Sequence, residues 1–169
     1  MFWASYIDQP ESKDIHFLVR DTEQTGTGAV PATKWIRASS PQHGVQATHL
    51  ALEDHREFPH DTDFPAKYLV FTPSAHRYAQ PWYVGLCRGM AYVPIFLAAD
   101  QVRFSQSPSG GGQGNPAWDF QWFIPDCKVG RRYRFVLHVL YTEHGASERN
   151  PLIPGDALRR AIQAAAKFE

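Results

Sequence analysis

The stretch Arg-Phe-Ser-Gln-Ser-Pro-Ser-Gly-Gly-Gly at residues 103–112, followed by Asn-Pro-Ala-Trp-Asp-Phe-Gln-Trp at residues 115–122, decides the fold class of this chain. Polar and apolar residues alternate on both sides of a glycine-rich connection, and a period of two residues is typical of β-strands. The pattern predicts two strands, each with one polar face, joined by a loop. Such an arrangement suits a β-protein that holds a polar, ring-shaped ligand at a cleft rimmed by the loop.

The same alternation recurs along most of the chain. Strands are predicted at residues 2–7, 15–20, 34–39, 46–52, 67–72, 82–88, 91–98, 101–106, 118–124 and 133–142. In the last of these, we expect one set of side chains to face the core: Tyr133, Phe135, Leu137, Val139 and Tyr141. Strands without intervening helices indicate an all-β fold, an antiparallel β-sandwich or jelly-roll-like arrangement.

Two turn residues refine this prediction. Gly89-Met90 lies between two predicted strands, and glycine at the first central position favours a hairpin with a type II′ turn. Pro94 has no N–H to donate to a strand ladder, so its strand is predicted to lie at a sheet edge or to carry a bulge.

The C-terminal part of the chain is predicted to differ from the rest. Asp156 suits a helix N-cap, and an apolar stripe follows at helical spacing: Leu158, Ile162, Ala165 and Ala166. Arg159 and Arg160 are predicted to face water. The expected division is therefore a β-sandwich domain at residues 1–150 and a linker with one short helix at residues 151–169. Because residues 2–7 already read as a strand, two readings stay open: a complete domain, or one that lacks an N-terminal part.

Composition narrows the class of protein. The chain has 169 residues with 17 basic and 17 acidic side chains, and no basic stripe, so we expect neither nucleic acid nor membrane as a partner. No signal peptide precedes the first strand, which indicates the cytoplasm if Met1 is the native start. Cys87 and Cys127, the two cysteines, are interpreted as reduced small hydrophobes, with a single disulfide as the alternative.

Three segments resemble a group of uncharacterised bacterial proteins: residues 2–7, residues 83–90, and the pair of stretches at 103–112 and 115–121. The last pair matches their signature RFSxSPxGGG…NPAWDFQ near the end of a β-rich domain. The resemblance covers most of residues 1–142 and implies an architecture similar to the β-sandwiches common among sugar-active enzymes. Those proteins are longer at the N-terminus, which favours the incomplete reading. No assigned activity comes with the resemblance.

Two groups of candidate site residues lie on the two strands of the opening stretch. Arg103, Ser105 and Ser107 share one face and are predicted to bind a ligand's hydroxyl or carboxylate groups, beside glycines that let backbone amides approach. Asp119 and Gln121 share a face opposite the aromatic residues, with Asp119 as a candidate general acid or base and Gln121 and Trp118 as candidate ligand contacts. The alternatives are an exposed strand edge, an aromatic core, and a structural ion pair of Asp119 with Arg103 or Arg88.

Two further groups are weaker. His43 and His49 near a strand start are candidates for acid–base catalysis or, with His55 or His60, for metal binding, although no HxH or HExxH motif is present. Tyr83 and Arg88 in the predicted hairpin are candidates to stack on and clamp a sugar ring.

The function predicted from these residues is recognition of a saccharide or another polar small molecule, with or without catalysis. No nucleotide-binding fingerprint, phosphate loop or GxSxG elbow is present, and no cofactor is expected. Two alternatives stay open: a non-catalytic module or half-domain that pairs through a sheet edge, and a His-ligated, metal-dependent enzyme acting on small molecules. The oligomeric state is left open.

Overall fold

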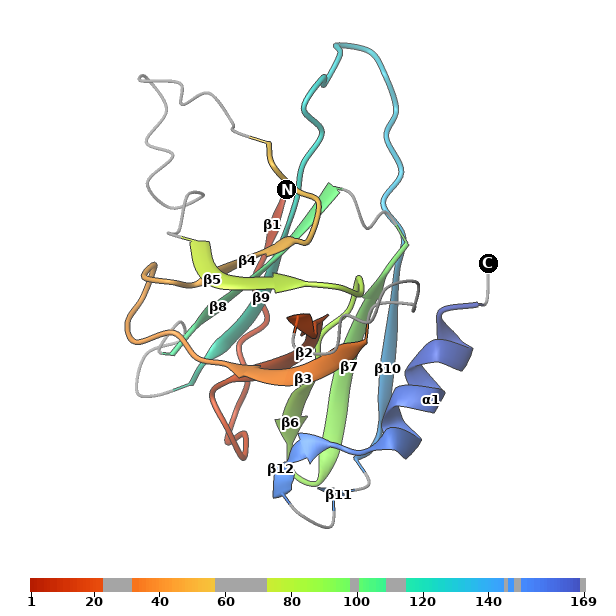
Figure 1. The fold of residues 1–169 in the computed structure, drawn as a ribbon. Coiled ribbons are helices and arrows are strands. Elements are labelled where there is room, and N and C mark those ends of the chain that lie inside the picture. The colour runs from red at the N-terminus through yellow and green to blue at the C-terminus, as the bar shows by residue number, and fades with distance from the viewer. Residues whose placement is uncertain are drawn as a thin grey trace.

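The computed structural model describes residues 1–22, 32–56, 73–97, 101–108, 115–144, 146–147 and 150–167. It is all-β with one C-terminal helix, and two sheets form a sandwich (Figure 1). The large sheet contains, in spatial order, β1 (Phe2–Trp3), β9 (Ala117–Trp122), β8 (Val102–Ser107), β4 (Thr48–Ala51) and β5 (Pro73–Tyr78). The small sheet contains β10 (Leu137–Glu143), β7 (Met90–Phe96) and β6 (Gly85–Cys87).

Two strand pairs and the helix complete the fold. They are β2 (Ile15–Arg20) with β3 (Thr33–Ala38), β11 (Ala146–Ser147) with β12 (Asn150–Pro154), and α1 (Asp156–Ala165). Every pairing is antiparallel, as predicted, except that β4 and β5 run parallel. The sequence did not predict β5, and the strand predicted at residues 67–72 lies outside the described residues. Among the described residues, no helix is long and apolar enough to cross a membrane.

The first hydrophobic core lies between the two sheets. Phe104, Trp118 and Phe120 point into it from the large sheet, and Phe96 meets them from the small sheet. The ring centroids of Phe96 and Phe120 are 4.9 Å apart and nearly edge-to-face, a favourable aromatic geometry. We call this side of the large sheet its inner face. Because side chains alternate along a strand, Arg103, Ser105, Asp119 and their neighbours at alternate positions lie on the outer face.

The second hydrophobic core lies on the other side of the small sheet, where α1 packs. Leu158 and Ile162 are buried there against Val93 and Ile95, as the helical spacing predicted. The N-cap is Gly155 and not Asp156, with no side-chain cap hydrogen bond. Arg159 is half-buried instead of facing water, because its Nη2 donates to Thr33 Oγ1 on β3 at 2.8 Å.

The core-facing pattern predicted for residues 133–142 is wrong for most of its members. Tyr133, Val139 and Tyr141 are 37, 54 and 57% exposed, and β10 begins only at Leu137. Leu140, from the alternate set, packs against the second core instead. The reason is position: β10 is an edge strand of the small sheet, and only Leu137 at its start and Phe135 just before it pack against the first core.

The hairpin between β6 and β7 is confirmed, but its turn is shifted by one residue. Cys87 pairs with Met90, so the turn consists of Arg88 and Gly89, and both have positive φ angles, 55° and 75°. Positive φ at both central residues defines a type I′ turn, not the type II′ turn that was predicted. The edge or bulge predicted from Pro94 is also wrong, since β7 is the central strand. The missing N–H is tolerated because β6 ends opposite Tyr92.

Replacing Gly89 with Ala is expected to destabilise the fold by about 1 kcal/mol, measured by chemical denaturation. A Cβ added at Gly89 would have no atom within 4 Å, so the whole effect comes from the positive φ. Gly89→Asn should be milder, because asparagine tolerates this backbone region better. Equal losses for Ala and Asn would contradict the assignment to backbone strain.

Candidate polar site on the large sheet

Four polar side chains lie next to one another on the outer face of the large sheet. Thr48 on β4 is paired with Ser105 on β8, and Ser105 with Asp119 on β9, so the three form a line across three strands. Gln121 follows Asp119 at the next position on the same face, opposite Arg103. We call Thr48, Ser105, Asp119 and Gln121 the polar row. The shared face of Arg103, Ser105, Asp119 and Gln121 agrees with the alternation in the sequence.

The polar row is buried, and most of its hydrogen-bonding atoms have no partner. None of its four side chains is more than 3% exposed. Thr48 Oγ1, Ser105 Oγ and both amide atoms of Gln121 make no hydrogen bond to the protein. Buried polar groups are normally paired, so a group of unpaired atoms on adjacent strands needs a physical explanation, such as bound water, a bound ion or a functional role. Unpaired buried atoms also occur outside the row, at His16, Tyr83 and Gln106. The row therefore contains buried hydrogen-bonding atoms whose capacity the protein's own groups do not satisfy.

Asp119 is the one ionisable member of the row. Its Oδ1 accepts a hydrogen bond from the backbone N–H of Ser5 at 3.1 Å, where the pairing of the N-terminal strand with β9 is interrupted. Burial raises the pKa of Asp119 from 3.8 to about 7, and the Ser5 hydrogen bond opposes this only in part. A carboxyl with a pKa near neutrality can donate or accept a proton under ordinary conditions.

The structural ion pair predicted for Asp119 is wrong. Arg103 Nε binds Asp54 Oδ2 at 2.8 Å, and Arg88 Nη2 binds Asp8 Oδ2 at 2.8 Å at the β6–β7 turn. Both guanidinium groups thus have other carboxylates as partners. The pKa of Asp119 stays high for this reason, because no cation offsets the effect of burial.

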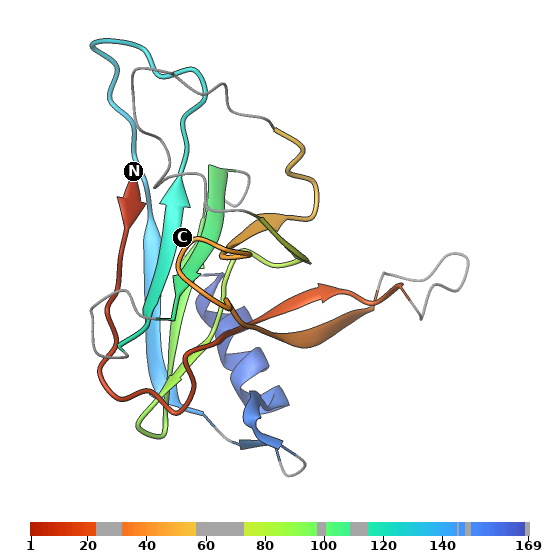
Figure 2. The ribbon, with the colours of Figure 1, turned by 90° about the vertical axis from the view of Figure 1, so that its left-hand side faces the viewer.

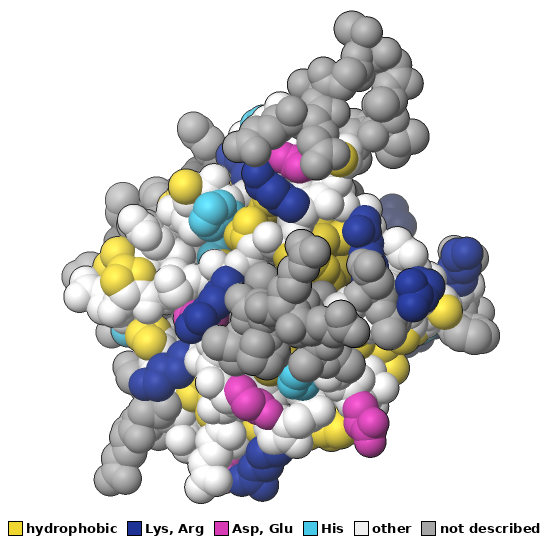
Figure 3. Space-filling model, turned by 60° about the horizontal axis from the view of Figure 1, so that its bottom comes forward, with side chains coloured by type: hydrophobic (Ala, Val, Ile, Leu, Met, Phe, Trp, Pro, Cys, Tyr) yellow, Lys and Arg dark blue, Asp and Glu magenta, His cyan; other side chains and the backbone are white. Residues whose placement is uncertain are grey.

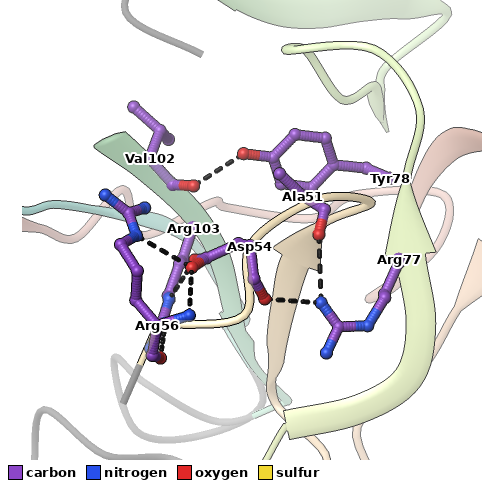
Figure 4. A network of polar contacts seen from close by, with 7 residues as sticks. All are labelled: Ala51, Asp54, Arg56, Arg77, Tyr78, Val102 and Arg103. Carbon is purple, nitrogen blue, oxygen red and sulfur yellow. Dashed lines mark hydrogen bonds and ion pairs between the residues drawn. The ribbon is translucent and has the colours of Figure 1, made fainter. Parts of the chain in front are cut away.

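Arg103 instead belongs to an ion-pair network centred on Asp54 (Figure 4). Asp54 is 5% exposed and accepts hydrogen bonds from Arg56 Nε at 2.9 Å and from Arg103 Nε. Arg77 donates to the backbone oxygens of Ala51 and Asp54 at 3.1 and 2.7 Å. Burial alone would raise the pKa of Asp54, but the hydrogen bonds from Arg56 and Arg103 outweigh it and hold the pKa well below its usual range. The network fixes Arg103 beside the polar row.

His43 and His49 do not form a pair. His43 Nδ1 lies 2.8 Å from Ser107 Oγ, which belongs to the outer face. His49 points into the first core, with its ring 4.9 Å from that of Phe17. Burial lowers the pKa of His49 to about 3, helped by His76. The two imidazoles therefore lie on opposite sides of the sheet and cannot share a substrate or a metal ion.

One pair in this region was not predicted from the sequence. His49 Nδ1 lies 2.7 Å from Ser74 Oγ on β5, a hydroxyl–imidazole contact of the kind that activates serine nucleophiles. With a pKa of about 3, however, His49 is too weak a base to take the serine proton near neutral pH. The contact is a structural hydrogen bond.

The described residues contain no group of three or more His, Cys, Asp and Glu side chains placed to hold a metal ion. His55 is an exposed side chain near Glu53, with 3.9 Å between Nε2 and Oε2. His60 and the glycines at 110–112 lie outside the described residues. Both cysteines are free, and burial raises the pKa of Cys87, which disfavours a reactive thiolate.

Trp118 and Tyr83 lie in the first core, not on the outer face. Trp118 is fully buried, and its Nε1 donates to the backbone oxygen of Lys13 at 3.2 Å. Tyr83 is also fully buried, which raises the pKa of its hydroxyl well above the ordinary value. Arg88 lies at the exposed β6–β7 turn. None of these three joins the polar row, so the site is narrower than the sequence suggested and includes Thr48, which was not predicted as a site residue.

Neither the distribution of surface charge nor similarity to known proteins identifies a ligand for this site. On the face shown in Figure 3, the described Lys and Arg side chains are spread among acidic, His and uncharged groups rather than gathered into one patch. Comparisons of the chain with protein-family models, with curated proteins and with solved structures find no match.

Proposed function

We propose that this protein binds a neutral, hydroxyl-rich ligand of the saccharide class on the outer face of its large sheet. The observation that carries the proposal is the polar row, in which two hydroxyls and one carboxamide are buried without partners beside a carboxyl group. Unpaired buried polar atoms are unfavourable, so a molecule that pairs with them gains both affinity and specificity.

The chemistry of the row favours a hydroxyl-rich ligand. Ser105 and Thr48 each offer one donor and an acceptor, and the Gln121 carboxamide offers both at fixed positions. Sugar hydroxyls likewise donate and accept. An anionic ligand is less suitable, because the Asp119 carboxyl lies in the middle of the row and Arg103 is held by Asp54. From β4 to β9 the row spans two strand spacings, about 10 Å. Its side chains are at most 3% exposed, so a ligand reaches them only when the outer face is uncovered.

The arrangement supports recognition better than hydrolysis. Glycoside hydrolysis commonly uses two carboxyl groups, one to protonate the leaving oxygen and one to act as a base or nucleophile. Asp119, with its raised pKa, suits the acid role. The neighbouring carboxylate of Asp54 is bound by two guanidinium groups and kept ionised, which leaves it poorly placed to attack or to move a proton.

The test is a titration of the purified chain with neutral monosaccharides, disaccharides and uronic acids, followed by calorimetry and by thermal unfolding. We expect saturable binding of a neutral saccharide, and stabilisation of about 2.7 kcal/mol at a concentration of about 100 times Kd. Gln121→Leu should weaken binding by about tenfold or more, because the carboxamide contacts are lost. Gln163→Leu, at an exposed position of α1, is the matched control and should bind normally.

Sugars at high concentration stabilise most proteins by exclusion from the surface, so only a saturable effect counts. A titration without saturable binding of any neutral saccharide would overturn the proposal. Equal affinities of the wild type and Gln121→Leu for the saccharide would show that it binds somewhere other than the polar row.

A further inference from the structure

The outer edge of β10 takes no part in the proposed function. β10 is the last strand of the small sheet and pairs only with β7 among the described strands. Its side chains Val139 and Tyr141 are more than half exposed, although both are apolar or aromatic. Figure 2 shows β1 and β10 at the same side of the sandwich, where each sheet ends. A strand edge with exposed apolar side chains is a template for pairing with another strand.

The hydrogen-bond pattern identifies the backbone groups that this edge offers. Leu97 N–H donates to Val136 O, and His144 N–H donates to Gly89 O, so even-numbered residues bond to the β7 side. Pro94 opposite Val139 has no N–H, which agrees with this alternation. The N–H and C=O groups of the odd-numbered residues, Leu137, Val139, Tyr141 and Glu143, therefore point away from β7, and no other described residue bonds to them.

We propose that two copies of this chain associate by antiparallel pairing of their β10 strands about a twofold axis at Leu140. In this register Val139 lies opposite Tyr141 of the second copy, and Leu137 opposite its Glu143. Each of these pairs joins two odd-numbered residues, so N–H and C=O groups match along the whole edge. The contact is isologous, which is the usual form of a homodimer interface.

The side chains and charges support a second copy as the occupant. The twofold register sets exposed Val139 beside exposed Tyr141, and an aromatic residue next to a β-branched one is a favourable cross-strand pair. No like charges face each other, because Glu143 meets Leu137 and His138 meets Thr142. The formal net charge of the chain is zero at pH 7, so long-range repulsion between copies is absent.

The first experiment measures the mass of the purified chain in solution across a range of concentrations, by sedimentation equilibrium. We expect a concentration-dependent monomer–dimer equilibrium. Val139→Pro should weaken dimerisation at least about tenfold, since the lost N–H is used twice in a symmetric interface. It should still unfold cooperatively, because that N–H makes no bond to β7. Val129→Lys, at a fully exposed position away from β10, is the control and should dimerise normally.

A second experiment tests the register. The double variant Val139→Lys, Tyr141→Lys brings like charges together and should be monomeric, whereas Val139→Lys, Tyr141→Glu brings opposite charges together and should recover the dimer. A wild type that stays monomeric at every concentration would overturn the proposal. The partner of this edge would then have to be a strand from a different protein. A dimer that Val139→Pro leaves intact would also overturn it, as would equal behaviour of the two double variants.

Discussion

Replacing Asp119 with Asn is expected to stabilise the fold by up to about 4 kcal/mol at pH 8 and to change it little at pH 4. The folded-state pKa of about 7 lies above the ordinary value of 3.8 by about three units, and each unit corresponds to about 1.4 kcal/mol. Asparagine has nearly the same shape and keeps an oxygen that accepts the Ser5 N–H. It removes the buried negative charge, which is the source of the penalty.

The direction of this pH dependence follows from the number of protons that the folded and unfolded chains bind. Between pH 4 and pH 7 the folded chain keeps a proton on Asp119 that the unfolded chain has lost, so the stability of the wild type falls as the pH rises through this window. Above pH 7 the loss is complete. The asparagine variant lacks this dependence, and its advantage over the wild type should therefore grow from pH 4 to pH 7 and then stay constant.

Chemical denaturation of the wild type and Asp119→Asn at a series of pH values measures this difference. Asp126→Asn, at an exposed carboxylate, is the control and should show little change at any pH. A variant that is less stable than the wild type at pH 8 would show that the negative charge of Asp119 contributes favourably to the fold. Such a result would contradict the assignment of the raised pKa to burial.

Replacing Asp54 with Ala is expected to have the opposite sign and to destabilise the fold by about 3 kcal/mol at neutral pH. The change leaves Arg103 and Arg56 without their carboxylate, and the Arg103 side chain is only 13% exposed. Removing the carboxylate that binds a largely buried guanidinium group is unfavourable, whereas losing an exposed pair has little effect. The matched control is Asp8→Ala, which breaks the exposed ion pair with Arg88 and should lower stability by less than about 1 kcal/mol.

The pH dependence distinguishes this effect from lost packing. Because the pKa of Asp54 is depressed in the fold, its stabilising contribution is present above about pH 4 and is lost as the pH falls. The difference between wild type and Asp54→Ala should therefore shrink in acid. A difference that is constant down to low pH would indicate that the charge of Asp54 is not what stabilises the network.

The strands were predictable where residue types alternated, even though β2 and β9 are buried on both faces. Residues 15–20 match β2 at both ends, and the opposite faces of Phe120 and Asp119 followed from period two alone. The burial predicted for one face of β10 was wrong, because alternation shows which side chains share a face but not whether another sheet covers that face. Tyr141 satisfies the pattern of a core residue and is 57% exposed.

The site was predictable in part for a related reason. Alternation predicted that Arg103 and Ser105 share one face and that Asp119 and Gln121 share another, and pairing of β8 with β9 places the two groups side by side. Thr48 joins them through pairing of β4 with β8, a contact across more than fifty residues that no local pattern encodes. Asp54 was also missed, since an acidic residue in a charged segment looks the same whether it faces water or holds Arg103. His49 was predicted to be a site residue because the sequence does not distinguish a buried, neutral imidazole from a catalytic one.

The pairing of β1 with β9 has a consequence for how the chain is made. Ser5 meets Asp119, a residue 114 positions later, so the first strand leaves the ribosome long before its partner exists. At ordinary rates of translation the interval is roughly 6 to 23 seconds. Throughout that time Phe2 and Trp3 lack the strand with which they pair in the fold. The large sheet closes at this side only after β9 has been synthesised, which makes docking of the N-terminal strand a late step in folding.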